Sequence, residues 1–217
     1  MKLQGKKINF LGDSITHGSG TTSEDKIFTS LIKERYNLAA SRNYGIDGSR
    51  IAYQYENGVA VPGNSFVKRV DDMDEDADII VIFGGTNDFG HGNAPFGTFD
   101  DRTPDTFCGA CHVLMTKLLN RYPGKPIVFL TPLHRGNEDS PRGDHKPEDV
   151  ATLAEYVEVI RRTAAYYALP VLDLYKMSGI QPRVPVIRER LCPDALHPND
   201  AGHNLLADRI GAFLESL

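Results

Sequence analysis

The alternation of short apolar runs with amphipathic stretches is the feature of this 217-residue sequence that most constrains its fold. Two of the runs, Ile79 to Phe83 in DIIVIFGG and Ile127 to Leu130 in PIVFLTP, are almost continuously hydrophobic. Such runs are typical of strands in a parallel sheet that is covered on both faces. Three weaker runs, KINFLG, SRNYG around Asn43 and LPVLDLY around Val171, raise the expected number of strands to five.

Helical patterns fill the segments between these runs. The first apolar stripe comprises Phe28, Leu31, Ile32 and Tyr36. Further helices are expected over residues 103–122, from about 147 to 167, and from Asn199 or Asp200, both good N-caps, to the C-terminus. Strand–helix alternation predicts a three-layer α/β/α fold with a mostly parallel sheet. No linker-like stretch interrupts it, so residues 1–217 are expected to form a single domain.

Charge and the N-terminal segment limit the classes of partner. The formal net charge is −5, which disfavours a nucleic-acid partner because phosphate binding requires a basic surface. The N-terminal MKLQGKKINFLGDS has no apolar run long enough for a signal peptide or a membrane span. The default expectation is therefore a cytoplasmic protein. Nothing in the sequence specifies an oligomeric state.

The motifs for metal, redox and phosphate chemistry are missing or isolated. The CGAC segment, with Cys108 and Cys111, lies in an expected helix and has no second C-x-x-C, which favours buried helix packing. The seven histidines have no zinc-ligand spacing, so no metal is expected. Neither a P-loop nor a G-x-G-x-x-G loop is present.

Polar residues gather where the expected strands end, which is where parallel α/β sheets bind ligands. The first strand leads into Gly12-Asp13-Ser14, a turn that could expose Ser14 as a nucleophile, although the G-x-S-x-G elbow is absent. Such a serine needs a base and a group to orient that base. Asp194 and His197 lie three residues apart before the last helix and fit these two roles.

Two further strand ends offer groups for an oxyanion. Gly48, in NYGIDG, could give an unobstructed backbone N–H, and Asn87, in GGTND, could give a side-chain amide. With the N–H of Ser14 they would form an oxyanion hole suited to acyl transfer. Asp13 is expected to hold the turn by local hydrogen bonds. His203 lies inside the last helix and is expected to be structural.

Four blocks in this order, GDSIT, NYGIDG, GGTND and DALHPN, resemble those of the SGNH hydrolases, also called the GDSL esterase/lipase family. The resemblance implies that Ser14, Gly48, Asn87 and His197 are the four residues that name the family, with Asp194 as the triad acid. It also implies a flavodoxin-like sheet of five parallel strands. Ile15 stands where the family name has leucine, which is a small change in packing.

The predicted function is that of a serine ester hydrolase that needs no cofactor and acts on a small-molecule ester. Short acyl esters, such as acetyl esters of a polar alcohol like a carbohydrate, are favoured because the loops at the site are rich in Gly, Asp, Asn, His and Arg. The alternatives are a lysophospholipase or thioesterase acting on longer chains, and, from another class, a non-catalytic binding module.

Three long loops, residues 89–105, 133–147 and 176–193, are expected to set the choice of substrate. Phe89, His134 and Arg135 are the candidate substrate-binding residues among them. Phe89, Phe96 and Phe99 could instead line a groove for an acyl chain, which would favour the longer esters.

Overall fold

The computed structural model describes residues 1–217, and at its centre lies a sheet of five parallel strands in the order β2-β1-β5-β6-β7. The strands are β1 (Lys7–Gly12), β2 (Ala40–Gly45), β5 (Ile79–Phe83), β6 (Ile127–Leu130) and β7 (Val171–Leu172). Each forms at one of the expected runs, and every residue of β5 and β6 is buried, as continuous apolar runs require. The predicted five-stranded parallel sheet is confirmed.

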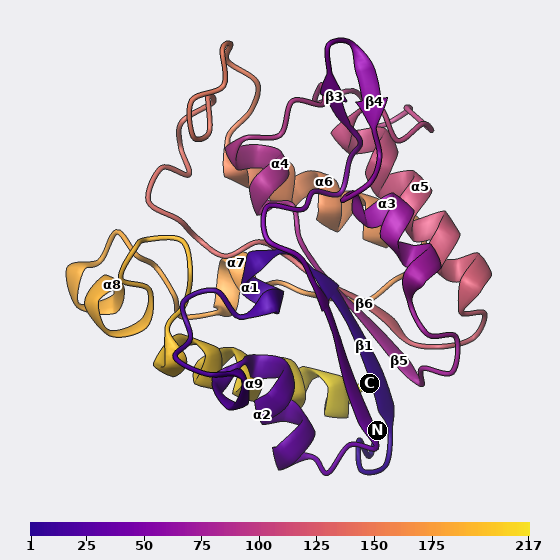
Figure 1. The fold of residues 1–217 in the computed structure, drawn as a ribbon, viewed down its shortest axis with the longest axis vertical. Coiled ribbons are helices and arrows are strands. Elements are labelled where there is room, and N and C mark those ends of the chain that lie inside the picture. Colours follow the sequence, from indigo (N-terminus) through magenta and orange to yellow (C-terminus); the bar gives the residue numbers. More distant parts are fainter.

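Helices cover both faces of this sheet (Figure 1). On one face lie α2 (Phe28–Arg35) and α9 (Asp200–Ser216), and on the other lie α3 (Phe66–Arg69), α5 (Phe107–Arg121) and α6 (Leu153–Tyr166). Side chains along β5 point alternately to the two faces of the sheet. Ile79, Val81 and Phe83 therefore join one core, and Ile80 and Ile82 join the other. The predicted three-layer α/β/α arrangement is therefore confirmed.

Three short helices begin directly after strands and gather at the carboxyl edge of the sheet (Figure 1). They are α1 (Ser14–His17), α4 (Thr86–Gly90) and α7 (Leu174–Met177), which follow β1, β5 and β7. The remaining helical elements are α8 (Pro185–Leu191) and two 3₁₀ turns, η1 (Glu24–Lys26) and η2 (Val70–Asp72). None of the helices has the length and apolar character that a membrane crossing demands.

Two predicted helices begin later in the chain than expected, because their capping residues fix the start. Thr106, and not Thr103, caps α5 by accepting a hydrogen bond from the N–H of Gly109 at 3.1 Å. A capping box of Thr152 and Glu155 starts α6, so residues 147–151 belong to the preceding loop. The buried face of α6 carries Leu153, Tyr156, Val157 and Ile160.

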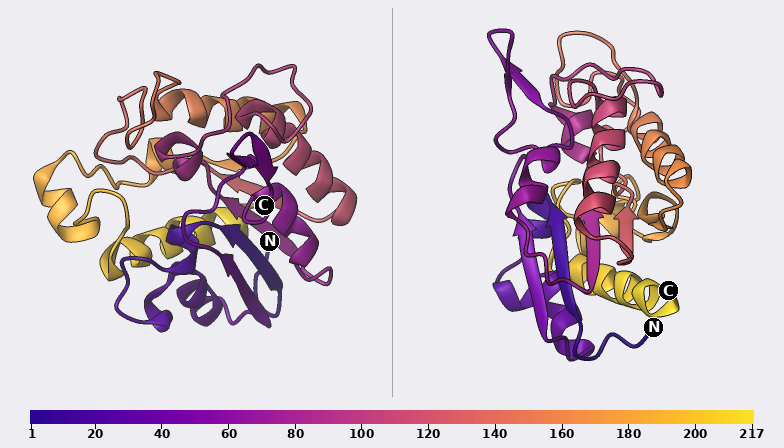
Figure 2. Two further views of the ribbon diagram at one scale, coloured as in Figure 1. Left: turned by 45° about the horizontal axis from the view of Figure 1, so that its top comes forward. Right: turned by 90° about the vertical axis from the view of Figure 1, so that its right-hand side faces the viewer.

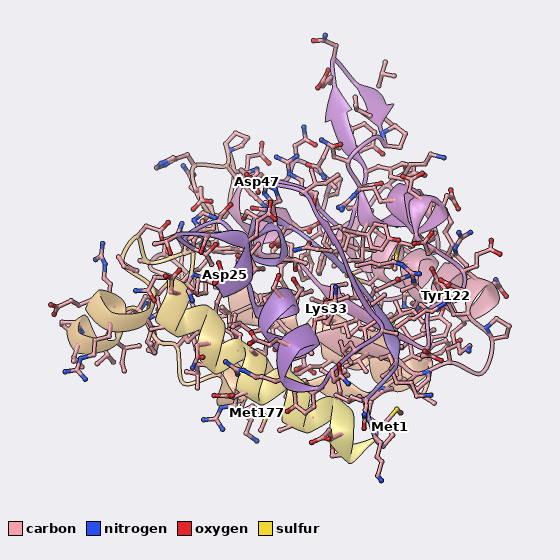
Figure 3. The ribbon with its side chains drawn as sticks, turned by 60° about the horizontal axis from the view of Figure 1, so that its bottom comes forward. Met1, Asp25, Lys33, Asp47, Tyr122 and Met177 are labelled. Carbon is pink, nitrogen blue, oxygen red and sulfur yellow. The ribbon has the colours of Figure 1, made fainter.

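A hairpin that the sequence analysis did not foresee joins β3 (Gln54–Glu56) to β4 (Val59–Val61). Its turn has Asn57 at φ 51° and Gly58 at φ 77°, the left-handed pair that a two-residue hairpin favours. The hairpin projects from the body of the molecule beyond the carboxyl edge of the sheet (Figures 2 and 3).

All three cysteines are free and buried, including Cys108 and Cys111 in α5, so CGAC takes part in helix packing as expected. His203 is fully buried in α9 and accepts a hydrogen bond from the N–H of Phe28 at 3.2 Å. Burial lowers the pKa of His203 to about 4, which agrees with its predicted structural position.

Candidate active site

Strand register brings three of the predicted loops together. Gly12, the last residue of β1, is the register partner of both Gly45 at the end of β2 and Phe83 at the end of β5. The loops that carry Ser14, Gly48 and Asn87 therefore leave the sheet side by side. In Figure 3, the labelled Asp47 marks the loop that follows β2.

Ser14 is the first residue of α1, and Asp13 caps this helix by accepting a hydrogen bond from the N–H of Ile15 at 3.0 Å. Asp13 thus has the local role that the sequence predicted. Ser14 retains 7% exposure, and its Oγ lies 3.0 Å from Nε2 of His197. A serine hydroxyl at this distance can donate its proton to the imidazole.

His197 and Asp194 form the pair that the sequence spacing predicted. Nδ1 of His197 lies 2.7 Å from Oδ2 of Asp194, and the other carboxylate oxygen accepts the N–H of His197 at 2.7 Å and that of Leu196 at 2.9 Å. Although partial burial opposes ionisation, these hydrogen bonds hold the pKa of Asp194 below its ordinary value. An ionised Asp194 fixes the imidazole with Nδ1 protonated and Nε2 free to accept.

Neighbouring segments hold the loop of Asp194 and His197 in place. The carbonyl of Ala195 accepts the N–H of Gly136 at 3.0 Å, and that of Pro193 accepts Nε of Arg188 at 3.2 Å. Asn199 then caps α9 by accepting the N–H of Gly202 at 3.1 Å. The loop is therefore fixed at both of its ends.

The predicted oxyanion donors have unpaired N–H groups. The backbone N–H groups of Ser14 and Gly48 donate no hydrogen bond within the chain. Gly48 has φ 68°, which favours glycine. Asn87 is buried in α4 and uses one N–H of Nδ2 to bond the carbonyl of Ser49 at 3.1 Å, which leaves its second N–H unpaired. Buried polar groups are usually paired, so the unpaired N–H groups of the buried Ser14 and Asn87, with that of the partly exposed Gly48, are suited to a ligand oxygen.

A buried arginine that the sequence analysis missed fastens the Gly48 loop to the sheet. Arg69 of α3 donates to the carbonyl of Gly12 at 3.2 Å and to Oγ of Ser49 at 2.9 Å, and it also bonds the carbonyl of Tyr44. Its guanidinium thus links the ends of β1 and β2 with the residue next to Gly48. Only the fold brings these groups together, because Arg69 belongs to no motif.

Two buried carboxylates support the same region. Burial raises the pKa of Asp13 to about 7, against the opposing hydrogen bond from the N–H of Ile15. Asp88, next to Asn87, accepts the N–H groups of Ile51 at 2.9 Å and Ala52 at 3.0 Å, and burial raises its pKa as well. Asp88 therefore ties the start of α4 to the chain that follows Gly48.

The three predicted substrate-binding residues lie in different surroundings. Phe89 is fully buried, 5.9 Å from the ring of Tyr156, so it packs in the core and cannot meet a substrate. Arg135 is also buried, and it pairs with Asp144 and donates to the carbonyl of Thr86 at 3.2 Å. His134 is partly exposed and bonds Glu138 at 2.7 Å. Of the three, only His134 keeps accessible surface.

Two further residues at this edge, His91 and Arg50, escaped the sequence analysis. Nε2 of His91 lies 3.1 Å from Oδ1 of Asn87, and Nδ1 of His91 contacts the guanidinium of Arg50. The four-residue separation of Asn87 and His91 on a short helix was the one available signal.

Known proteins resemble this chain over most of its length. The model of the GDSL-like lipase/acylhydrolase family matches residues 10–205. A solved structure of a protein from Lactobacillus plantarum is 30% identical, with a TM-score of 0.83 and 98% coverage of both chains. No curated protein matches the chain.

Two more distant solved structures share the fold. A putative GDSL-like lipase from Bacteroides ovatus is 22% identical, with a TM-score of 0.71 over 98% of this chain and 99% of that one. The acetyl xylan esterase AlAXEase is 22% identical, with a TM-score of 0.65 over 96% of this chain and 99% of that one. With its four sequence blocks brought to one edge of the sheet and a family match over residues 10–205, the chain belongs to the GDSL-like lipase/acylhydrolase family and is a hydrolase of ester bonds.

Proposed function

We propose that the protein hydrolyses esters through an acyl-enzyme on Ser14, with His197 as the base and Asp194 as the acid that orients it. The observation that carries the proposal is the continuous chain from Oγ of Ser14 to Nε2 of His197 at 3.0 Å and from Nδ1 to Asp194 at 2.7 Å. Residues 1–217 would act as one domain, because a single sheet and its flanking helices carry all these groups.

In this mechanism Oγ of Ser14 attacks the ester carbonyl while His197 takes its proton. The negative charge that develops on the carbonyl oxygen meets the unpaired N–H groups of Ser14, Gly48 and Asn87. The imidazolium, stabilised by Asp194, returns its proton to the leaving alcohol. Water then enters with His197 again as the base, and the acid product leaves Ser14.

We further propose a short acyl group, such as acetyl, on a polar alcohol such as a carbohydrate. The positions of the three phenylalanines support this choice, because the hollow that Phe96 and Phe99 line contains none of Ser14, Gly48, Asn87 and His197. Phe89 is buried, Phe96 packs 4.9 Å from Tyr156, and Phe99 packs 4.8 Å from His112. The acetyl xylan esterase fold match is compatible with such a substrate.

The first test is Ser14→Ala, measured on chromogenic acetyl esters beside Ser19→Ala as a matched control. Ser19 follows directly after α1, and its hydroxyl donates to Asp47 at 3.2 Å and makes no hydrogen bond to His197. Removing the nucleophile should lower kcat by about 10³ or more, whereas the control should keep its turnover. Near wild-type turnover of folded Ser14→Ala would refute the mechanism.

Labelling by a fluorophosphonate separates the enzyme from a non-catalytic binding module. An activated Ser14 should be labelled in the wild-type protein and not in Ser14→Ala. A wild-type protein that resists labelling would favour the binding module.

A further inference from the structure

The ring of His91 lies between Asn87 and Arg50 at the end of α4. Its Nε2 lies 3.1 Å from Oδ1 of Asn87, and its Nδ1 contacts a terminal nitrogen of Arg50. A Cβ built on Gly48 would come 4.0 Å from Cε1 of His91, so the ring also borders the loop of the second oxyanion donor.

Hydrogen-bond chemistry allows one neutral form of this ring. A guanidinium only donates, so Nδ1 of His91 must accept from Arg50 and carry no proton. In the neutral imidazole the proton then resides on Nε2, which donates to Oδ1 of Asn87. Arg50 therefore donates to His91, and His91 donates to Asn87.

The hydrogen bond on the other side of the Asn87 amide independently supports the same orientation. Its Nδ2 donates to the carbonyl of Ser49 at 3.1 Å, and a carbonyl can only accept, so Oδ1 must face His91. With Oδ1 and one N–H occupied, the amide cannot flip without losing both bonds. Its second N–H is thereby fixed in direction.

From this geometry we propose that His91 is a positioning residue for the reaction, held in its Nε2–H form by Arg50, and that it aims the free N–H of Asn87 at the oxyanion. The proposal rests on the proposed function of Asn87 as an oxyanion donor. A donor fixed before the reaction costs no reorganisation in the transition state. Polarisation along the Arg50–His91–Asn87 chain also strengthens the last donor.

The charges around the ring favour its neutral form. Burial and then the positive charge of Arg50 lower the pKa of His91, with Arg135 and Lys146 acting in the same direction. Asp144 is the one nearby charge that opposes them. Protonation would place an N–H of His91 against an N–H of Arg50. The chain of hydrogen bonds from Arg50 through His91 to Asn87, called the relay below, therefore requires the neutral ring.

A double-mutant cycle between His91→Ala and Asn87→Ala tests the relay. Asn87→Ala should lower kcat by roughly 10² to 10³, as loss of an oxyanion donor does. His91→Ala should lower kcat about tenfold with KM nearly unchanged, because the oxyanion forms only in the transition state. In the Asn87→Ala background the same change should cost less than about twofold, because its effect passes through Asn87.

The matched control is His145→Ala, which removes an exposed histidine from the same hollow of about 420 Å³. His145 makes no side-chain hydrogen bond to Asn87, so kcat should persist. Arg50→Lys, which keeps a donor for Nδ1, should retain more kcat than Arg50→Met. His91 keeps exposed surface although its ring is partly buried, so thermal unfolding should show that His91→Ala still folds.

The outcomes separate the relay from the mechanism on which it rests. A full kcat in Asn87→Ala would overturn the oxyanion role and the relay together. Losses of kcat that multiply in the double variant would overturn only the relay. A rise of KM alone in His91→Ala would also overturn only the relay and would assign His91 to substrate binding. Coupled losses in kcat, with the control unaffected, support it.

Discussion

Asp13 shows at the scale of one residue how a turn beside a nucleophile is stabilised at an energetic cost. Its side chain caps α1 through the N–H of Ile15, yet the carboxyl group is almost fully buried. Burial raises its pKa from 3.8 to about 7. Between these two values the folded protein holds a proton that the unfolded chain has released, so the free energy of unfolding falls as pH rises.

Asp13→Asn should therefore remove a pH dependence of stability. Asparagine keeps an oxygen for the N–H of Ile15 but does not titrate in this range. The free energy of unfolding of the variant minus that of wild type should rise between pH 4 and pH 7, by at most about 1.4 kcal/mol per pH unit, and then level off. Urea unfolding of both proteins across this range measures it, and a difference that does not depend on pH would contradict the raised pKa.

At the scale of elements, the loop after α1 supports the loop of His197. Gly20 has φ 98°, and a Cβ there would lie 2.4 Å from the carbonyl oxygen of Pro198 and 3.2 Å from Cβ of His197. Alanine at this position forces the Gly20 loop and the histidine loop apart, and small misplacements of a catalytic group are costly.

Gly20→Ala should consequently lower kcat by about tenfold or more. The matched control is Gly5→Ala, because Gly5 has a positive φ of 75° but nothing within 4 Å of its Cβ. Both variants should lose about 1 to 2 kcal/mol of stability from the left-handed backbone, while the control keeps its kcat. Equal kcat in the two variants, both folded, would mean that the contact with Pro198 does not position His197.

The elements and their contacts also show how much of the structure could be predicted from the sequence. Apolar runs predicted the strands of the central sheet, most clearly β5 and β6, because continuous burial permits few other structures. The pairing of Asp194 with His197 was predictable because it is local. The contacts of Arg69 with the ends of β1 and β2 were not, because they join segments that only the folded sheet brings together. Phe89 was misjudged for a related reason, as its loop position gave no sign that α6 would bury it.

On the scale of the whole molecule, the packing of the loops against the helices bears on the proposed preference for short acyl groups. The phenylalanines of the long loop after Asn87 are drawn into contacts with α5 and α6, as in the 6.1 Å stacking of Phe96 on Phe107. The carboxyl edge, where Ser14 and His197 meet, is left to polar loops. A long acyl chain would gain about 0.8 kcal/mol for each methylene that it buries in an apolar groove. Phe96 and Phe99 line a hollow that includes neither Ser14 nor His197.

We therefore expect kcat/KM to be highest for acetyl or butyryl esters and to fall for octanoyl and palmitoyl esters of the same chromogenic alcohol. Because the alcohol is constant, the series isolates the acyl group, and substrate concentrations below micelle formation keep the longer esters comparable. A groove that accepted the chain would raise kcat/KM by about fourfold for each buried methylene. An increase continuing beyond octanoyl would overturn the short-acyl proposal and favour a lysophospholipase or thioesterase, while leaving the Ser14 mechanism intact.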